Sequence, residues 1–542
     1  MNAARPTAPA RPDLVVLADR VYAQFPYRRP AHAVAVCGGR VAAVGDRRAV
    51  LRMRGRRTRV LDLRDGCVTP GLCDAHTHFF YWALGRALVI DVAGIGSLEA
   101  TLAKIQREAP RRRIGDWVLG RGFDQNIWGR GFPTASDLDA VVPDRPALLR
   151  SRDGHAAWLN SPALRACSVT PQTPDPPGGR YLRDERGRPT GVALESAVDA
   201  LPAPIRDFAA RDDRDATRVI DRALQSAYRA AWSFGVVAVG ALDDAPSLAH
   251  LQRHRATGAL GLRVVHSVPV DRFAEIQRLG VRGGLGDDWF RVGAVKMFAD
   301  GTLGSQTAYM FDAYPGRPTD FGVPVLAGEA LRAAVVAAAR AGWATWIHAI
   351  GDRAVHDAVV AIAAARRVEP HFLHHRIEHT QCIRPADARA MGRVRIHASV
   401  QPCHLVSDIG PADRHWPRAR RNAYAFRRLL DAGVNLALGS DVPVETIDPR
   451  RGFHGGVART DEHGLPAGGW FPKEKLTAAE VLRGFTEGAA ASLGRPAGWG
   501  TLAVGAPADM TLWASDPLRA PPTAWQRVGI RGCVVAGEVH VD

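Results

Sequence analysis

Short apolar runs separated by turn residues mark both ends of the chain as β structure. Four such runs lie within residues 13–67, and two more lie near residues 510–535, with glycine-containing turns between them. Neither region shows the 3.6-residue periodicity of an amphipathic helix. Because the two regions flank one long middle segment, we expect a single small β-sandwich built from residues 1–67 and 500–542.

Between these regions, short apolar runs alternate with alanine- and arginine-rich stretches that are typical of helices. This alternation predicts eight strands, at residues 68–76, 236–240, 262–267, 293–298, 344–348, 376–378, 395–400 and 434–439. Helices are predicted at residues 216–233, 330–341, 354–364 and 423–432. Eight strand–helix repeats indicate an α/β fold, a (β/α)8 barrel of the TIM type that spans residues 68–499.

The interval between the first two predicted strands is too long for one connecting helix. Residues 93–210 contain further strand-like runs and a segment rich in proline and glycine at 171–191. A loop of this length without structure of its own would be unusual in a compact domain. We therefore expect an inserted lid or cap subdomain at residues 93–210.

Composition and charge exclude several classes of protein. The 542 residues are 46% hydrophobic and 23% charged, as in ordinary globular chains. No apolar run reaches the roughly 18 residues of a membrane span, and residues 1–13 contain no apolar signal core, so we expect a cytoplasmic protein without a membrane partner. The net charge of +16 raises the question of nucleic-acid binding. Because the basic residues are spread along the chain, we expect a solvated arginine-rich surface and no nucleic-acid partner.

Cysteine and lysine usage adds two observations. The seven cysteines are scattered, odd in number and never spaced as CxxC, which indicates reduced thiols. Only four of the 71 basic residues are lysine, and one of them, Lys296, lies in an apolar strand-like run. Lysine shifts its pKa and reacts, whereas arginine stays charged. Lys296 is therefore a candidate for a chemical role.

Side chains that bind metal recur where the predicted barrel strands end. Each has a simpler explanation by itself, since His348 or Asp441 could cap a helix and an isolated HxH is more often not a ligand pair. The active sites of barrels, however, gather at the carboxyl ends of the strands. We therefore predict one metal centre from the ends of strands one, four, five, six and eight, at His76, His78, Lys296, His348, His379 and Asp441.

The phrases around these positions resemble the amidohydrolase superfamily, and in particular its third family, which includes N-substituted formamide deformylase-like enzymes. They are VTPGLCDAHTH at 68–78, VKMFADG at 295–301, HAIGDR at 348–353, RIEH at 376–379 and GSDVPV at 439–444. The resemblance extends over residues 13–540. The chain departs from the family pattern at Gln306, where an arginine is usual, and at 189–195, where an alanine precedes the usual leucine. Both departures bear on substrate preference.

The resemblance implies a ligand set and a reaction. His76, His78 and Asp441 would hold one divalent metal ion, and His348 and His379 would hold a second. Their nitrogen and oxygen ligands favour zinc. A metal-activated hydroxide would attack a non-peptide C–N bond of a small amide or formamide, and Asp441 would carry the proton to the leaving amine.

Several points stay open at this stage. Lys296 would bridge two metal ions if carboxylated to a carbamate, or would hydrogen-bond a carboxylate such as Asp300 beside a single ion. Asp153 and His155, in the DGH phrase of the insertion, are candidates for substrate contact, or form an Asx-type turn packed under Trp158. The sequence is compatible with one or two metal ions per chain and with a homo-oligomer.

Other functions are compatible with the same fold. A mononuclear deaminase, or a hydrolase of carbamates or esters, would use the same ligands, and the ligand set alone does not separate these from an amide hydrolase. A non-catalytic regulatory protein on this scaffold would lack ligands, and none of the expected ligands is missing from the sequence.

Overall fold

The computed structural model describes residues 11–541, apart from residues 113, 126, 130, 152–155, 177 and 178. Contacts divide the chain into a barrel unit, residues 1–79 with 228–542, and an insertion unit, residues 80–227. The divisions fall near the start of helix α2 (Phe79–Leu88) and within helix α8 (Arg214–Ser233). None of the described helices is both long and apolar enough to cross a membrane.

Apart from the short antiparallel strand β15 (Leu285–Gly286), which pairs with β16, the barrel sheet has eight strands in which each neighbouring pair is parallel and follows chain order, as the sequence predicts. They are β6 (Leu72–Thr77), β13 (Val236–Ala241), β14 (Arg263–Pro269), β16 (Phe290–Phe298), β17 (Ala344–Ala349), β18 (Arg376–His379), β19 (His397–Val400) and β20 (Leu436–Leu438). The seam between β6 and the residues after β20 is closed by two backbone hydrogen bonds. Asp441 N donates to His76 O, and His78 N donates to Val442 O, each at 2.8 Å.

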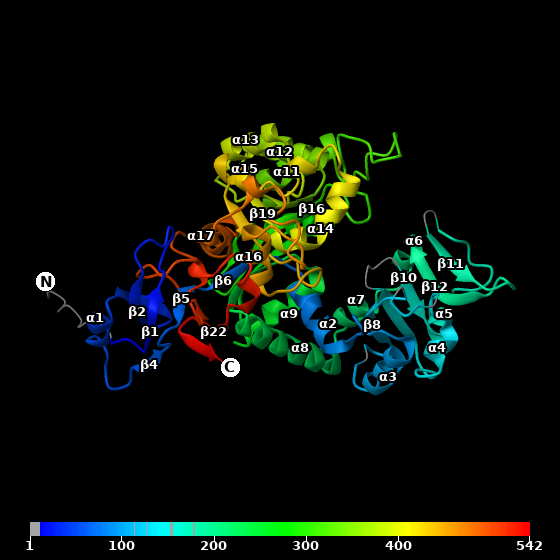
Figure 1. Ribbon diagram of the computed structural model, residues 1–542, viewed down its shortest axis with the longest axis horizontal. Coiled ribbons are helices and arrows are strands. Elements are labelled where there is room, and N and C mark those ends of the chain that lie inside the picture. Colours follow the sequence, from blue (N-terminus) through cyan, green and yellow to red (C-terminus); the bar gives the residue numbers. More distant parts are fainter. Residues whose placement is uncertain are drawn as a thin grey trace. The chain divides into compact units, whose positions relative to one another are not determined.

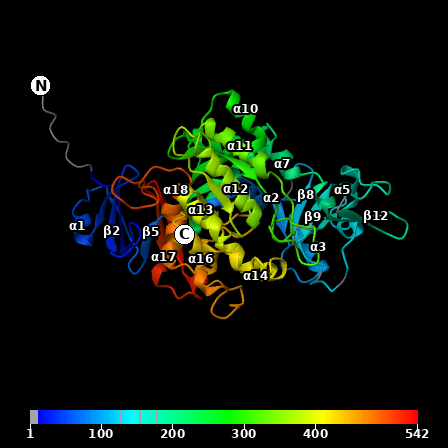
Figure 2. The same cartoon turned by 90° about the horizontal axis from the view of Figure 1, so that it is seen from above.

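Alanine-rich helices cover the outside of these strands. Helices α11 (Gly328–Arg340), α12 (Asp352–Ala365) and α13 (Pro385–Val394) lie side by side in both views (Figures 1 and 2). The buried positions of α11 follow the i, i+4, i+7 spacing of one helix face. The prediction of a helix over 423–432 is wrong at its start, because α15 spans only Phe426–Asp431. Tyr424 has a φ of 51° and donates its N–H to Gln381 O, so a helix cannot begin before it.

The predicted first strand, 68–76, is two strands in the structure. β5 (Cys67–Pro70) belongs to the sheet formed by the chain ends, where it pairs with β21 (Met510–Trp513), whereas β6 belongs to the barrel. Gly71 is the residue at which the chain changes sheets. A Cβ atom at this position would lie 2.4 Å from Val237 Cγ2 and 3.1 Å from the Asp509 carbonyl carbon. The backbone therefore passes between the two sheets only because residue 71 has no side chain.

We expect Gly71→Ala to lower the free energy of unfolding by about 1–3 kcal/mol, because the added methyl group overpacks this junction. Gly45→Ala is the matched control, since a Cβ atom there meets nothing within 4 Å. The control should stay within about 1 kcal/mol of the wild type. Urea unfolding of the three proteins measures both effects, and an equal response of the two variants would contradict a tight junction at residue 71.

Strands from both ends of the chain share one sheet in the order β23-β22-β21-β5-β1-β2-β3, with β4 also pairing with β1. The remaining strands are β1 (Leu14–Val21), β2 (Ala31–Cys37), β3 (Arg40–Gly45), β4 (Arg59–Asp62), β22 (Ile530–Val535) and β23 (Glu538–Val541). Val16, Val68 and Leu512 are buried in one hydrophobic cluster of this sheet. Figure 1 shows the early strands in blue beside β22 in red.

The insertion unit is built on a third sheet, in the order β11-β12-β10-β9-β8-β7. Its strands are β7 (Val89–Asp91), β8 (Val118–Phe123), β9 (Ala147–Ser151), β10 (Ala156–Leu159), β11 (Gly179–Arg183) and β12 (Pro189–Glu195). Helix α3 (Leu98–Glu108) contributes Ile105 to a core that also holds Leu149 and Trp158. Asp153 and His155 lie outside the described residues, so their predicted substrate contact stays a prediction.

Candidate metal centre

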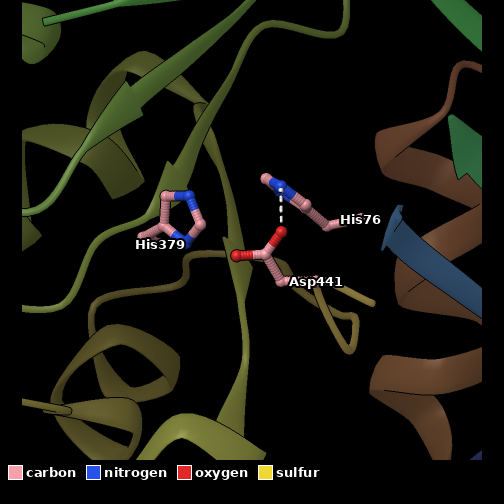
Figure 3. Close-up of side chains that lie close together, drawn as sticks. All are labelled: His76, His379 and Asp441. Atoms are coloured by element: carbon pink, nitrogen blue, oxygen red, sulfur yellow. Dashed lines mark ion pairs between the residues drawn. The ribbon is translucent and has the colours of Figure 1, made fainter. Parts of the chain in front are cut away.

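Three of the predicted ligands meet at the carboxyl ends of the barrel strands. One nitrogen of His76, one nitrogen of His379 and one carboxylate oxygen of Asp441 all lie within 4.8 Å of one another, and the three side chains are buried. They come from the end of β6, the end of β18 and the residues after β20. Figure 3 shows the carboxylate of Asp441 between the two imidazole rings, with its ion pair to His76 drawn as a dashed line. His76 Nε2 is 3.3 Å from Asp441 Oδ1.

Hydrogen bonds on the far side of each ring decide which nitrogen faces the cluster. His76 Nδ1 lies 2.7 Å from Glu378 Oε2, and a carboxylate can only accept. His379 Nδ1 lies 2.8 Å from the amide oxygen of Gln401, whose own nitrogen donates to the Ser399 carbonyl. Both Nδ1 atoms therefore carry hydrogen, which leaves the Nε2 lone pair of each neutral imidazole toward the cluster.

This donor set fits a divalent cation. Without a proton or a metal ion between them, the Nε2 lone pair of His76 and the Asp441 carboxylate oxygen would repel at 3.3 Å. Burial opposes the charged form of His76, but Asp441 and Glu378 outweigh it and raise the pKa of His76. The site is therefore arranged to hold positive charge. Its two histidines also share a common feature of metal-binding histidines, in which the second ring nitrogen is hydrogen-bonded to a carboxylate or an amide.

Two further predicted ligands lie against the same cluster. His78 Nε2 is 3.5 Å from Asp441 Oδ1, and its Nδ1 is 3.7 Å from Oδ1 of Asp243, two residues after the end of β13. The ring of His348 is 4.5 Å from the ring of His379, centroid to centroid. His348 Nε2 is 3.1 Å from the Gly301 carbonyl oxygen and donates to it, so its lone pair is on Nδ1.

Lys296 is buried on β16, with its Nζ 4.6 Å from the centre of the Phe298 ring. Burial lowers the pKa of Lys296 to about 8, although the charges of Glu378 and Asp441 act in the opposite direction. The described part of the chain contains no ion pair between Lys296 and Asp300. The carboxylate of Asp300 instead accepts three backbone N–H groups, those of Tyr309, Ile350 and Gly351, at 2.8–3.0 Å.

Sequence reasoning missed the residues that hold these ligands in place. Glu378 binds His76 on one side and the Nε atom of Arg376 on the other, at 2.5 Å. Arg376 is itself fully buried, donates to the Ala75 carbonyl at 2.9 Å, and lies 3.6 Å above the Trp346 ring. The sequence signal for these residues was the opposite charges of Arg376 and Glu378, two residues apart on a buried strand. Side chains two apart on a strand point to the same side, and buried charges require partners of opposite charge.

We expect Glu378→Gln to weaken metal binding by about 10- to 100-fold, because the charged acceptor that orients His76 is lost. Glu369→Gln is the matched control, since Glu369 also joins a histidine to an arginine, His375 and Arg366, elsewhere in the barrel. Competition with a zinc chelator measures the affinity of each protein. Equal zinc affinity in the two variants would show that Glu378 does not position a ligand.

Comparison with known proteins decides the family. The sequence profile of the amidohydrolase family matches residues 59–541. The chain belongs to the amidohydrolase family. This confirms the resemblance to the amidohydrolase family that is seen in the motifs.

Relatives of this amidohydrolase-family chain cover nearly its whole length. N-substituted formamide deformylase from Arthrobacter pascens is 29% identical, covering 93% of this chain and 94% of the relative. Protein LONG AFTER FAR-RED 3 from Arabidopsis thaliana is also 29% identical, covering 93% of this chain and 87% of the relative. An uncharacterized metal-dependent hydrolase from Pyrococcus furiosus has a solved structure with a TM-score of 0.78 and 25% identity, covering 93% of this chain and 100% of that one. Family and neighbours identify the chain as a hydrolase.

Proposed function

We propose that the protein is a metal-dependent hydrolase that cleaves a non-peptide C–N bond in a small amide- or formamide-type substrate. The observation that carries the proposal is the buried cluster of His76, His379 and Asp441 at the carboxyl ends of the barrel strands. The similarity to N-substituted formamide deformylase supports an amide-type substrate.

The chain's residues would hold one or two divalent ions, most suitably zinc, through His76, His78, His348, His379 and Asp441. Lys296 would join them as a carbamate. The lowered pKa of Lys296, about 8, supports this role because only the neutral amine adds carbon dioxide. When bound, the metal would lower the pKa of a water molecule and polarise the substrate carbonyl.

Asp441 would move the proton in this reaction. Its Oδ1 faces His76 and His78, whereas its Oδ2 lies 3.7 Å from His404 Nε2. Burial opposes ionisation of Asp441, but His76, His379 and His404 hold its pKa well below the usual value. Asp441 is therefore ionised in the resting site, and in this form it would accept the proton of the attacking water and pass it to the leaving nitrogen. Glu378 and Gln401 keep the two histidines in position during this transfer.

The test is a hydrolysis screen with metal-stripped protein and with the same protein reloaded with zinc, manganese or cobalt. Formamides such as formanilide, other N-acyl amines, cyclic imides, carbamates, esters and heterocyclic amines are the probes. Metal-dependent release of an amine from a formamide or N-acyl amine is the expected result. Turnover confined to esters or carbamates, or ammonia release from a heterocyclic amine, would replace the proposal with the alternative hydrolase or deaminase. A protein that binds no metal and turns over none of the probes would overturn it.

A further inference from the structure

His404 is a buried histidine beside the cluster whose role the ligand set does not explain. It lies in the first turn of α14 (Pro402–His415), the helix that follows β19, and is 8% exposed. Its ring stacks nearly parallel to that of His379, with the centroids 6.1 Å apart and the planes at 18°. Among the described residues, its Nε2 atom has no hydrogen-bond partner.

The surroundings of His404 place its hydrogen on that Nε2 atom. The amide nitrogen of Gln381 lies 3.4 Å from His404 Nδ1 and donates toward it, so Nδ1 is the acceptor of the ring. With Nδ1 as the acceptor, the N–H of the ring is on Nε2. The nearest carboxylate oxygen, Asp441 Oδ2, is 3.7 Å away and too distant for a hydrogen bond. Within the described part of the chain, His404 thus presents a buried donor without an acceptor at hydrogen-bond distance.

An unpaired buried donor costs about 1–3 kcal/mol, so its retention in this position indicates that a ligand supplies the acceptor. We propose that His404 is a substrate-binding residue whose Nε2–H donates a hydrogen bond to an oxygen of the bound substrate, on the Oδ2 side of Asp441. This inference rests on the proposed function for the identity of that oxygen, the carbonyl oxygen of an amide-type substrate.

The position suits an oxygen that gains negative charge during the reaction. His404 is held by Gln381 on one side and by the ring of His379 on the other. Its donor is therefore in place before the substrate arrives, and a fixed donor of this kind favours the transition state over the ground state. Asp441 has one oxygen toward the histidines His76 and His78 and the other toward His404. The carboxylate thus lies between the metal ligands and the proposed donor.

The variant His404→Phe keeps an aromatic ring and removes the donor, whereas His404→Gln keeps a side-chain N–H. His415→Phe, on the same helix, is the control. With formanilide as substrate, His404→Phe should lose about 100- to 1000-fold in kcat/KM, and His404→Gln should lose less. Metal content by elemental analysis should match the wild type in all variants.

Binding of methylphosphonate, a tetrahedral oxyanion, should weaken about tenfold or more in His404→Phe, as measured by calorimetry.

Each other outcome has a definite meaning. Loss of metal from His404→Phe would make His404 a metal ligand and overturn the inference. Methylphosphonate affinity equal to that of the wild type, or no binding by the wild type itself, would also overturn it. If the wild type hydrolyses no amide or formamide but binds methylphosphonate in a His404-dependent manner, the proposed function fails while the donor role of His404 stands.

Discussion

Replacement of Asp441 by asparagine is expected to lower kcat by roughly 10³- to 10⁴-fold. The amide cannot accept the proton of the attacking water, and it also removes the negative charge that faces His76 at 3.3 Å and His78 at 3.5 Å. Steady-state kinetics at saturating metal measure the effect on turnover, and elemental analysis separates it from loss of the metal.

The control for this change is Asp387→Asn. Asp387 is an equally buried carboxylate, but it pairs with His356 and Arg384 and lies on α13, outside the strands. The Asp387→Asn change should lower the free energy of unfolding more than it lowers kcat. An Asp441→Asn protein that retains full metal and at least a tenth of the wild-type kcat would exclude Asp441 as the proton carrier.

Lys296→Arg should be as inactive as Lys296→Ala, with roughly a 10³-fold loss, equivalent to about 4 kcal/mol. Arginine keeps the positive charge but cannot be carboxylated, so conservation of charge should not preserve activity. Formate or acetate should partly restore Lys296→Ala, because a small acid can enter the space left by the side chain and supply the missing oxygens. It should not restore Lys296→Arg, in which that space is filled.

Lys473→Arg serves as the control, since Lys473 is exposed. Its activity should equal that of the wild type. Activity of Lys296→Arg close to the wild-type level would show that residue 296 acts only through its charge, and the carbamate would then be excluded.

Most of the barrel could be predicted from sequence because most of its strands are largely apolar runs between helical stretches, with β18 (Arg376–His379) as the exception. β16 illustrates this, since its buried residues Val292, Val295 and Met297 favour a strand before any partner is known. The break at Gly71 could not be predicted in this way. Residues 67–77 are buried on both sides of it, so the hydrophobic pattern does not change where the chain leaves one sheet for another.

Some residues of the candidate site could likewise be predicted from the sequence pattern, and others could not. His76, His379 and Asp441 could be predicted because they end strands of a recognisable barrel. Gln401 and His404 could not, because their roles depend on which side chain of a neighbouring strand lies beside them. The hydrophobic periodicity of a strand or helix shows which face a residue lies on, but it does not identify the side chain that packs against it. The start of α15 was mispredicted for a related reason, since the backbone conformation at Tyr424 coincides with a hydrogen bond to the distant Gln381.

The pairing of β5 with β21 has a consequence for how the protein folds. β5 leads directly into the strand that carries His76, yet one of its two sheet partners, β21, lies near the other end of the chain. The seam that brings Asp441 to His76 likewise joins the first barrel strand to residues after the last. Both closures bring together segments far apart in sequence, and such contacts form late because the entropy of the long intervening chain must be lost first. A metal ion held by these residues would therefore be captured late in folding, by a nearly complete barrel.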